Sequence, residues 1–192
     1  MGSDDLARQK QLFREKLRFR RKHFAANLDP LAKLTAFRAL PAALAEIVES
    51  STPVAAYVAW GDEPDVLPML ADQAALALPH HQHRGDVMDF RLWSPGDALD
   101  SGPWSTRQPV DTADAANPGL IFCPLVGFDR RGGRLGQGGG HYDRYFALHP
   151  DIPRIGVAWS VQEVDAVPAG PTDIALDAIL TEQEYILTGD RL

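Results

Sequence analysis

The order of apolar and polar positions along the chain predicts helices that alternate with short strands. Residues 5–28 place apolar side chains at roughly helical spacing and basic side chains on the other face, which predicts an amphipathic helix that ends at Asp29-Pro30. Residues 31–49 continue a helical pattern, which Pro41 is placed to break or kink. Residues 65–77 and 142–148 are also predicted to be helical.

Short apolar runs between these helices predict buried strands. The predicted strands are residues 54–60, 87–93, 119–126, 155–159 and 178–180. A further short strand is predicted to begin at residues 76–78. The Pro- and Gly-rich residues 94–118 are expected to be mostly loop. Buried strands that alternate with helices favour an α/β fold with a largely parallel sheet and helices on both faces. No repeat or linker divides the chain, so we expect one domain over residues 1–192.

Composition and charge narrow the classes of function. The formal net charge is −7, which argues against generic attraction to nucleic acid or to an anionic membrane. Basic residues are concentrated between Arg8 and Lys22, so the rest of the chain is strongly acidic. Cys123 is the only cysteine and lies in the apolar run LIFCPLV, which predicts a buried core residue and fits a reducing compartment. Without a signal-peptide pattern or an apolar run long enough to span a bilayer, the expected location is the cytoplasm.

A glycine-rich segment is the main candidate for chemistry. Six of the residues from 132 to 140 are glycine, Arg134 and Arg144 bracket the segment, and Asp143 follows it. No Lys-Ser or Lys-Thr follows the glycines, and His141 stands where a dinucleotide fingerprint needs its last glycine, so neither common phosphate loop is present. A flexible surface turn remains open as the plain alternative. The order of strand, glycines, arginine and helix favours a nest for an anion, and a divalent cation would reconcile Asp143 with a phosphate.

Other charged residues are weaker candidates. Lys10 and Arg14 are spaced to share one helix face and could hold a polyphosphate, although a solvated face or an RNA- or membrane-binding face would explain the basic helix too. Glu63 follows the strand of residues 54–60, where ligand-binding acids occur in α/β sheets. Asp173 and Asp177 would lie together if their segment were helical. The histidines at 80, 81 and 83 lack a partner set for zinc and are interpreted as a polar loop.

These residues resemble the 5-formyltetrahydrofolate cyclo-ligase family, also called methenyltetrahydrofolate synthetases. The resemblance centres on residues 124–146, PLVGFDRRGGRLGQGGGHYDRYF, and extends over nearly the whole chain. Lys10, Arg14 and Arg21 match the family's N-terminal pattern. Three later segments also match it: VAAYVAWGDEPDVLPML, MDFRLWSPGD and IGVAWSVQEVDAVPAGPTDIALDAILTE.

The resemblance implies a three-layer fold of the NagB/RpiA/CoA-transferase type and an ATP- and Mg²⁺-dependent ligase. In the family's reaction ATP phosphorylates the formyl oxygen of 5-formyltetrahydrofolate, N10 attacks the activated carbon, and phosphate leaves. The product is 5,10-methenyltetrahydrofolate. The implied partners are a reduced folate and ATP, with no nucleic acid and no membrane, and the protein is expected to be a monomer.

The resemblance also implies roles for individual residues. The catalytic residues would be Arg134, Tyr142 and Asp143. The ATP-binding residues would be Lys10, Arg14, Arg134, Leu135, Gly136, Gln137, Gly138, Gly139, Gly140, His141 and Tyr142. The folate pocket would include Val58, Trp60, Glu63, Gln137 and Tyr142, with Met88 and Trp93 as further candidates. Asp143 and Asp173 would bind Mg²⁺, and Asp177 is a weaker candidate.

Three positions depart from the family's pattern. His141 replaces a frequent aromatic residue, Thr172 a frequent histidine, and Gln108 stands where the central segment usually has a glutamate. A relative that acts on another N-formyl or amide compound therefore stays open as an alternative. A non-enzymatic folate- or nucleotide-binding regulator is a second alternative. An RNA-binding module built on the basic helix is a third, and the acidic remainder of the chain argues against it.

Overall fold

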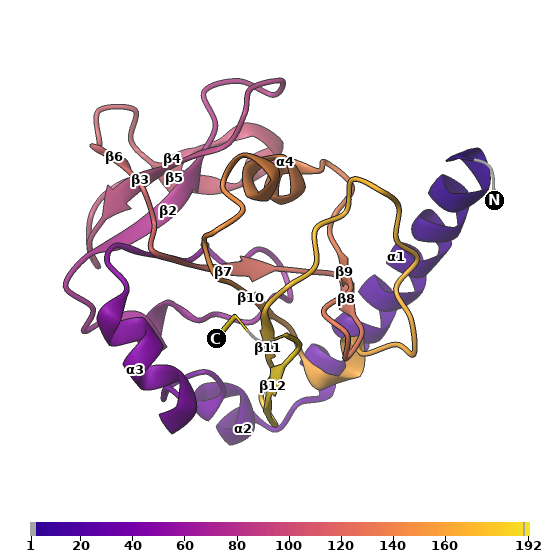
Figure 1. Cartoon of the computed structure of the whole chain (residues 1–192). Helices are drawn as coiled ribbons and strands as arrows, with labels where there is room; N and C mark the ends of the chain where they lie inside the picture. The colour runs from indigo at the N-terminus through magenta and orange to yellow at the C-terminus, as the bar shows by residue number, and fades with distance from the viewer. Residues whose placement is uncertain (1–2, 190) are drawn as a thin grey trace.

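The fold is centred on an eight-stranded sheet with the strand order β12-β11-β10-β7-β1-β2-β3-β6 (Figure 1). It is seen in a computed structural model that describes residues 3–189 and 191–192. The strands are β1 Val54–Ala55, β2 Leu76–His80, β3 Asp89–Trp93, β6 Ala115–Ala116, β7 Leu120–Pro124, β10 Arg154–Val157, β11 Ala178–Leu180 and β12 Tyr185–Leu187. The neighbours from β11 to β2 all pair in parallel, and antiparallel pairing is confined to β12, β3 and β6 at the edges. The predicted largely parallel sheet is confirmed.

Helices and two small hairpins surround this sheet. The helices are α1 Ser3–Asn27, α2 Pro30–Thr35, α3 Ala42–Ser50 and α4 His141–Leu148, with 3₁₀ turns η1 Leu67–Leu70, η2 Pro103–Ser105 and η3 Ser160–Gln162. One hairpin pairs β4 Leu99–Ser101 with β5 Arg107–Pro109, and the other pairs β8 Gly127–Phe128 with β9 Arg134–Leu135. Figure 1 shows α2 and α3 on one side of the sheet and α4 on the other, as the sequence predicted.

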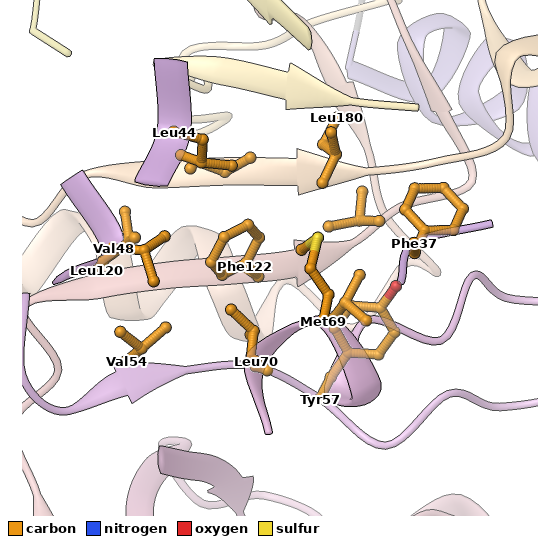
Figure 2. Packing of buried hydrophobic residues seen from close by; sticks show 14 of the residues in the cluster. Phe37, Leu44, Val48, Val54, Tyr57, Met69, Leu70, Leu120, Phe122 and Leu180 are labelled. Carbon is orange, nitrogen blue, oxygen red and sulfur yellow. The ribbon is translucent and has the colours of Figure 1, made fainter. Parts of the chain in front are cut away.

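The central strand β7 explains why its sequence is apolar without interruption. Its side chains alternate between two cores because successive residues of a strand point to opposite faces. Leu120 and Phe122 pack toward Leu44 and Val48 of α3 (Figure 2), while Cys123 packs toward Tyr145 and Phe146 of α4. Cys123 is fully buried, and this burial raises the pKa of its thiol to about 11, so the prediction of a core cysteine is confirmed.

The predicted break at Pro41 is confirmed: residues 31–49 form two helices, α2 and α3, and Pro41 is the N-cap of the second. Other predicted element boundaries were wrong. Residues 65–77 form only the short turn η1 before Leu76 begins β2, because strand pairing on both sides of β2 overrides the helical pattern. Residues 94–118 are mostly loop, as predicted, but they also contain the β4–β5 hairpin and β6. The apolar run of residues 54–60 pairs only as far as Ala56, whose N–H donates to the Ala77 carbonyl.

The long helix α1 packs beside the β8–β9 hairpin (Figure 1). Leu17 is fully buried there with Val126, Leu135 and Val167. This contact lays the basic face of α1 along the glycine-rich segment. Among the described residues no helix is long and apolar enough to cross a membrane.

Candidate functional site

A cavity of about 990 Å³ opens where β1, β2 and β7 end. Its walls come from the segment after β1, the ends of β2 and β7, helix α1, the glycine-rich segment and the start of α4. Carboxyl ends of parallel strands meet at one edge of a sheet, and ligands of α/β proteins bind there. The cavity therefore lies where the sequence placed its two candidate regions.

The glycine-rich segment forms one rim of this cavity. Gly138 and Gly140 have φ values of 112° and 65°, which residues with a side chain rarely adopt. Gly140 is the N-cap of α4, and among the described residues no side chain caps the free N–H groups of the first helical turn. Arg14 of α1 donates from Nε to the Gly136 carbonyl at 2.9 Å. An uncapped helix N-terminus behind a glycine loop favours an anionic ligand.

Arg134 and Asp143 form an ion pair in the cavity wall. The Arg134 Nη2 atom lies 2.7 Å from Asp143 Oδ2, and the arginine side chain is only 4% exposed. The Arg134 guanidinium also faces the Tyr142 ring at 5.7 Å. Arg134 Nε and the Tyr142 hydroxyl are buried without a hydrogen-bond partner among the described residues. Burial raises the pKa of Tyr142 well above its ordinary value, so its hydroxyl stays protonated and able to donate.

A second ion pair joins α1 to the C-terminal part of the chain. Lys10 Nζ donates to both carboxylate oxygens of Asp173, at 2.7 and 2.5 Å. The described residues contain no group of three or more side chains suited to a metal ion. Mg²⁺ commonly takes only one or two carboxylates and completes its shell with water and substrate phosphates. Asp143 and Asp173, which both line the cavity, therefore fit Mg²⁺ bound together with a polyphosphate.

Glu63 supplies a buried carboxylate beside the glycine-rich segment. Its side chain is 6% exposed, and Oε1 lies 3.4 Å from Nη1 of Arg21, which is 5% exposed. Oε1 also accepts from Gln137 Nε2 at 3.2 Å, and Oε2 accepts from the Trp60 N–H at 3.1 Å. Burial raises the pKa of Glu63 above its ordinary value. Arg21 and these hydrogen bonds lower the pKa, but by less than burial raises it. Oε2 keeps room for a further donor, because a carboxylate oxygen can accept two hydrogen bonds.

An aromatic wall was missed by the sequence prediction. His81, Trp104 and His141 pack edge to face or tilted, with ring centroids 4.5 to 5.4 Å apart, and all three line the cavity. Burial, with a smaller contribution from His141, lowers the pKa of His81 to about 4. The interpretation of the histidines as a polar loop was wrong for His81 and also for His80, which is buried in β2 and contacts Asp89 and Asp111. In the sequence, only the cluster of histidines directly after an apolar run could have indicated that His80 and His81 are buried.

The structure brings together the predicted site residues in one place. Every residue predicted to serve catalysis, ATP, folate or metal lines this cavity, with the exceptions of Trp93 and Asp177. Trp93 packs against the core on the α3 side of the sheet, and its indole N–H donates to the Asp97 carbonyl. Asp177 is buried beside Arg154 and Arg191, because residues 171–177 form no helix that would bring it next to Asp173.

The three positions that depart from the family's pattern also line the cavity. His141 belongs to the aromatic wall. Gln108 is buried, donates from Nε2 to the His81 carbonyl at 2.9 Å and accepts from the His81 N–H at 3.2 Å. A glutamate could accept from that N–H but could not donate to the carbonyl. Gln108 therefore holds His81 in the aromatic wall.

Comparison with known sequences finds relatives from one family, and the similarity extends along most of the chain. The sequence profile of the 5-formyltetrahydrofolate cyclo-ligase family matches residues 7–182. The 5-formyltetrahydrofolate cyclo-ligase of Mycolicibacterium smegmatis is 30% identical over 72% of this chain and 77% of that protein. The enzyme of the same name from Mycoplasma pneumoniae is 44% identical, but over 34% of this chain. The matches with the first three curated relatives span 42%, 50% and 44% of their lengths, about half of each.

Comparison with solved structures gives the same fold. The chain resembles the NMR structure of Aquifex aeolicus 5,10-methenyltetrahydrofolate synthetase with a TM-score of 0.72 and 26% identity, over 94% of this chain and 93% of that one. A 5,10-methenyltetrahydrofolate synthetase from Mycoplasma pneumoniae gives a TM-score of 0.59 at 24% identity over 90% of this chain and 98% of that one, which supports the fold alone.

Proposed function

The chain belongs to the 5-formyltetrahydrofolate cyclo-ligase family, and on this premise we propose that it converts 5-formyltetrahydrofolate and ATP to 5,10-methenyltetrahydrofolate, ADP and phosphate. One observation carries the proposal for this chain. A single cavity joins the buried carboxylate of Glu63 to the ion pairs Arg134–Asp143 and Lys10–Asp173 beside an uncapped helix. A folate presents a guanidine-like edge that suits a carboxylate, and ATP presents phosphates that suit the cations.

The chemistry requires activation of a formamide, which is a poor electrophile with a poor leaving group. The formyl oxygen attacks the γ-phosphorus of ATP and ADP leaves. N10 then attacks the formyl carbon and loses its proton to solvent, which closes the ring, and the C–O bond breaks to release phosphate. The protein's task is mainly to position the groups and neutralise their charge.

The side chains divide this task between phosphate binding and orientation of the folate. Lys10, Arg14 and Arg134, with the free N–H groups at the start of α4, would hold the phosphates. Asp143 and Asp173 would hold Mg²⁺, which neutralises phosphate charge when bound. Lys10 and Arg134 are paired with these carboxylates, so each would lie beside a phosphate bound to the Mg²⁺.

Glu63 would orient the pterin ring. The free acceptor position on its Oε2 can take a hydrogen bond from the guanidine-like edge, while Arg21 and the Trp60 N–H hold the carboxylate still. Val58 and Trp60 would line the ring's faces, and the Tyr142 hydroxyl, buried without a partner among the described residues, is a donor available to substrate.

We further propose a monomer that acts in the cytoplasm on small molecules. Cys123 as a buried free thiol fits a reducing compartment, and a net charge of −7 disfavours nucleic acid. Light scattering coupled to size exclusion measures the oligomeric state.

The test of the proposed function is ATP-dependent growth of the methenyl absorbance, followed together with ADP release. We expect both signals to need 5-formyltetrahydrofolate and Mg²⁺. ATP binding without any methenyl signal would favour a relative with another N-formyl or amide substrate. Tight folate binding without ADP release would favour a non-enzymatic regulator.

A further inference from the structure

The proposed function leaves Arg18 of α1 without a role. Arg18 lies one turn after Arg14 on α1 and is partly buried. Its Nε and Nη2 atoms donate to Gln137 Oε1 at 3.0 and 2.7 Å, and Nη2 also donates to the Gln137 carbonyl at 3.2 Å. A guanidinium holds one glutamine by both its side chain and its backbone.

The orientation of the Gln137 amide follows from the chemistry of its neighbours. Arg18 has only donors, so the amide oxygen must face it. The NH₂ group then faces Glu63 and donates to Oε1 at 3.2 Å, where the carboxylate can only accept. If the amide turned over, its oxygen would meet the carboxylate and its NH₂ would meet the guanidinium, and both contacts would be repulsive.

We propose that Arg18 is a positioning residue, which acts through the Gln137 amide to hold Glu63 in the orientation that receives the substrate. This inference rests on the proposed function. It assigns a task to a side chain that does not line the cavity, and it connects α1 and the glycine-rich segment to Glu63. Arg21 of α1 and the Trp60 N–H also hold Glu63, and Gln137 is the contact that reaches it from the glycine-rich segment.

The test compares the affinity of four variants for 5-formyltetrahydrofolate without ATP, measured by titration calorimetry. Arg18→Met removes the guanidinium and keeps a similar chain length. Arg8→Met is the matched control, because Arg8 is an exposed arginine of the same helix. Gln137→Met and the double variant Arg18→Met/Gln137→Met complete a cycle that isolates the coupling of the two residues.

We expect Arg18→Met to weaken binding by about three- to tenfold, the range of one partly exposed hydrogen-bonded contact. Arg8→Met should bind 5-formyltetrahydrofolate like the wild type. In the Gln137→Met variant, the further change Arg18→Met should weaken binding only slightly more. The Gln137 hydrogen bond lowers the pKa of Glu63, so the acidic limit of folate binding should move to higher pH in Arg18→Met and stay in place in Arg8→Met.

Two results would overturn the inference while leaving the proposed function intact. One is wild-type affinity in Arg18→Met, and the other is a double variant whose loss equals the product of the two single losses. Wild-type protein that fails to bind 5-formyltetrahydrofolate would overturn the proposed function as well. Should Arg18→Met fail to fold, Arg18→Ala takes its place, because Arg18 is only partly buried: unchanged affinity there overturns the inference, and a loss with the same pH shift supports it.

Discussion

Gly132 lies at a close backbone approach that sets the geometry of the hairpin presenting Arg134. Its φ is 85°, and a Cβ atom at this position would lie 2.5 Å from the Leu176 carbonyl oxygen. The Gly132 carbonyl accepts from the Leu176 N–H at 2.9 Å, so the same two segments are also held by a hydrogen bond. Gly132→Ala should therefore strain the backbone and push this contact apart.

Three alanine variants separate the two costs. Gly85 has no positive φ, and a Cβ atom added to it would meet no neighbour within 4 Å; Gly61 has a φ of 62° and equally open space around its Cβ position. We expect Gly85→Ala to change the free energy of unfolding by less than about 0.5 kcal/mol. Gly61→Ala should lower it by about 1 kcal/mol from backbone strain. Gly132→Ala adds overpacking and should lower it by about 3 kcal/mol in total.

Urea unfolding followed by circular dichroism measures these free energies, and thermal unfolding gives a second reading. For a chain of this size about 3 kcal/mol corresponds to a fall in Tm of roughly 6–12 °C. The reasoning is refuted if Gly132→Ala is no less stable than Gly61→Ala, since the close approach to Leu176 would then cost nothing.

Three further predictions concern charged and titratable groups. Asp143→Asn should abolish ATP-dependent methenyl formation, measured by absorbance, and near-normal turnover would exclude its metal role. Asp177→Asn should lower the free energy of unfolding by about 3–5 kcal/mol, because it leaves Arg154 buried beside a neutral amide. The folded variant should keep its affinity for 5-formyltetrahydrofolate. A weakened affinity would contradict the position of Asp177 outside the cavity. The pKa of His81 is about 4, below that of an unfolded histidine, so acid favours the unfolded chain. The free energy of unfolding of the wild type should fall as the pH is lowered from about 6.5 to 4, and that of His81→Gln should fall less over the same range. An equal fall in both proteins would contradict a His81 ring that is buried in its neutral form.

The sequence predicted the strongly patterned elements correctly. The helix of residues 5–28 and the strand of residues 119–126 have patterns long or apolar enough to determine their type, and both are present as α1 and β7. Weaker patterns failed where tertiary contacts compete with them. Residues 65–77 have helical spacing, but pairing of β2 with both neighbours takes its C-terminal part into the sheet.

The candidate site was predictable where a motif had a recognisable order. The glycine-rich segment, Glu63 and Lys10 stand out by their residue types and their places relative to strands, and all of them line the cavity. The aromatic wall was not predictable, because His81, Trp104 and His141 come from three segments far apart in the chain. No local pattern records that their rings meet.

The sequence by itself determined the class of fold and the family resemblance, and it predicted an anion nest in the glycine-rich segment, because these depend on local spacing and residue type. Only the tertiary structure decided which charges face each other. Asp173 and Asp177 are four residues apart, yet one pairs with Lys10 at the cavity and the other with Arg154 in the core. Such pairings depend on where the backbone carries each side chain, and contacts between distant segments set that path.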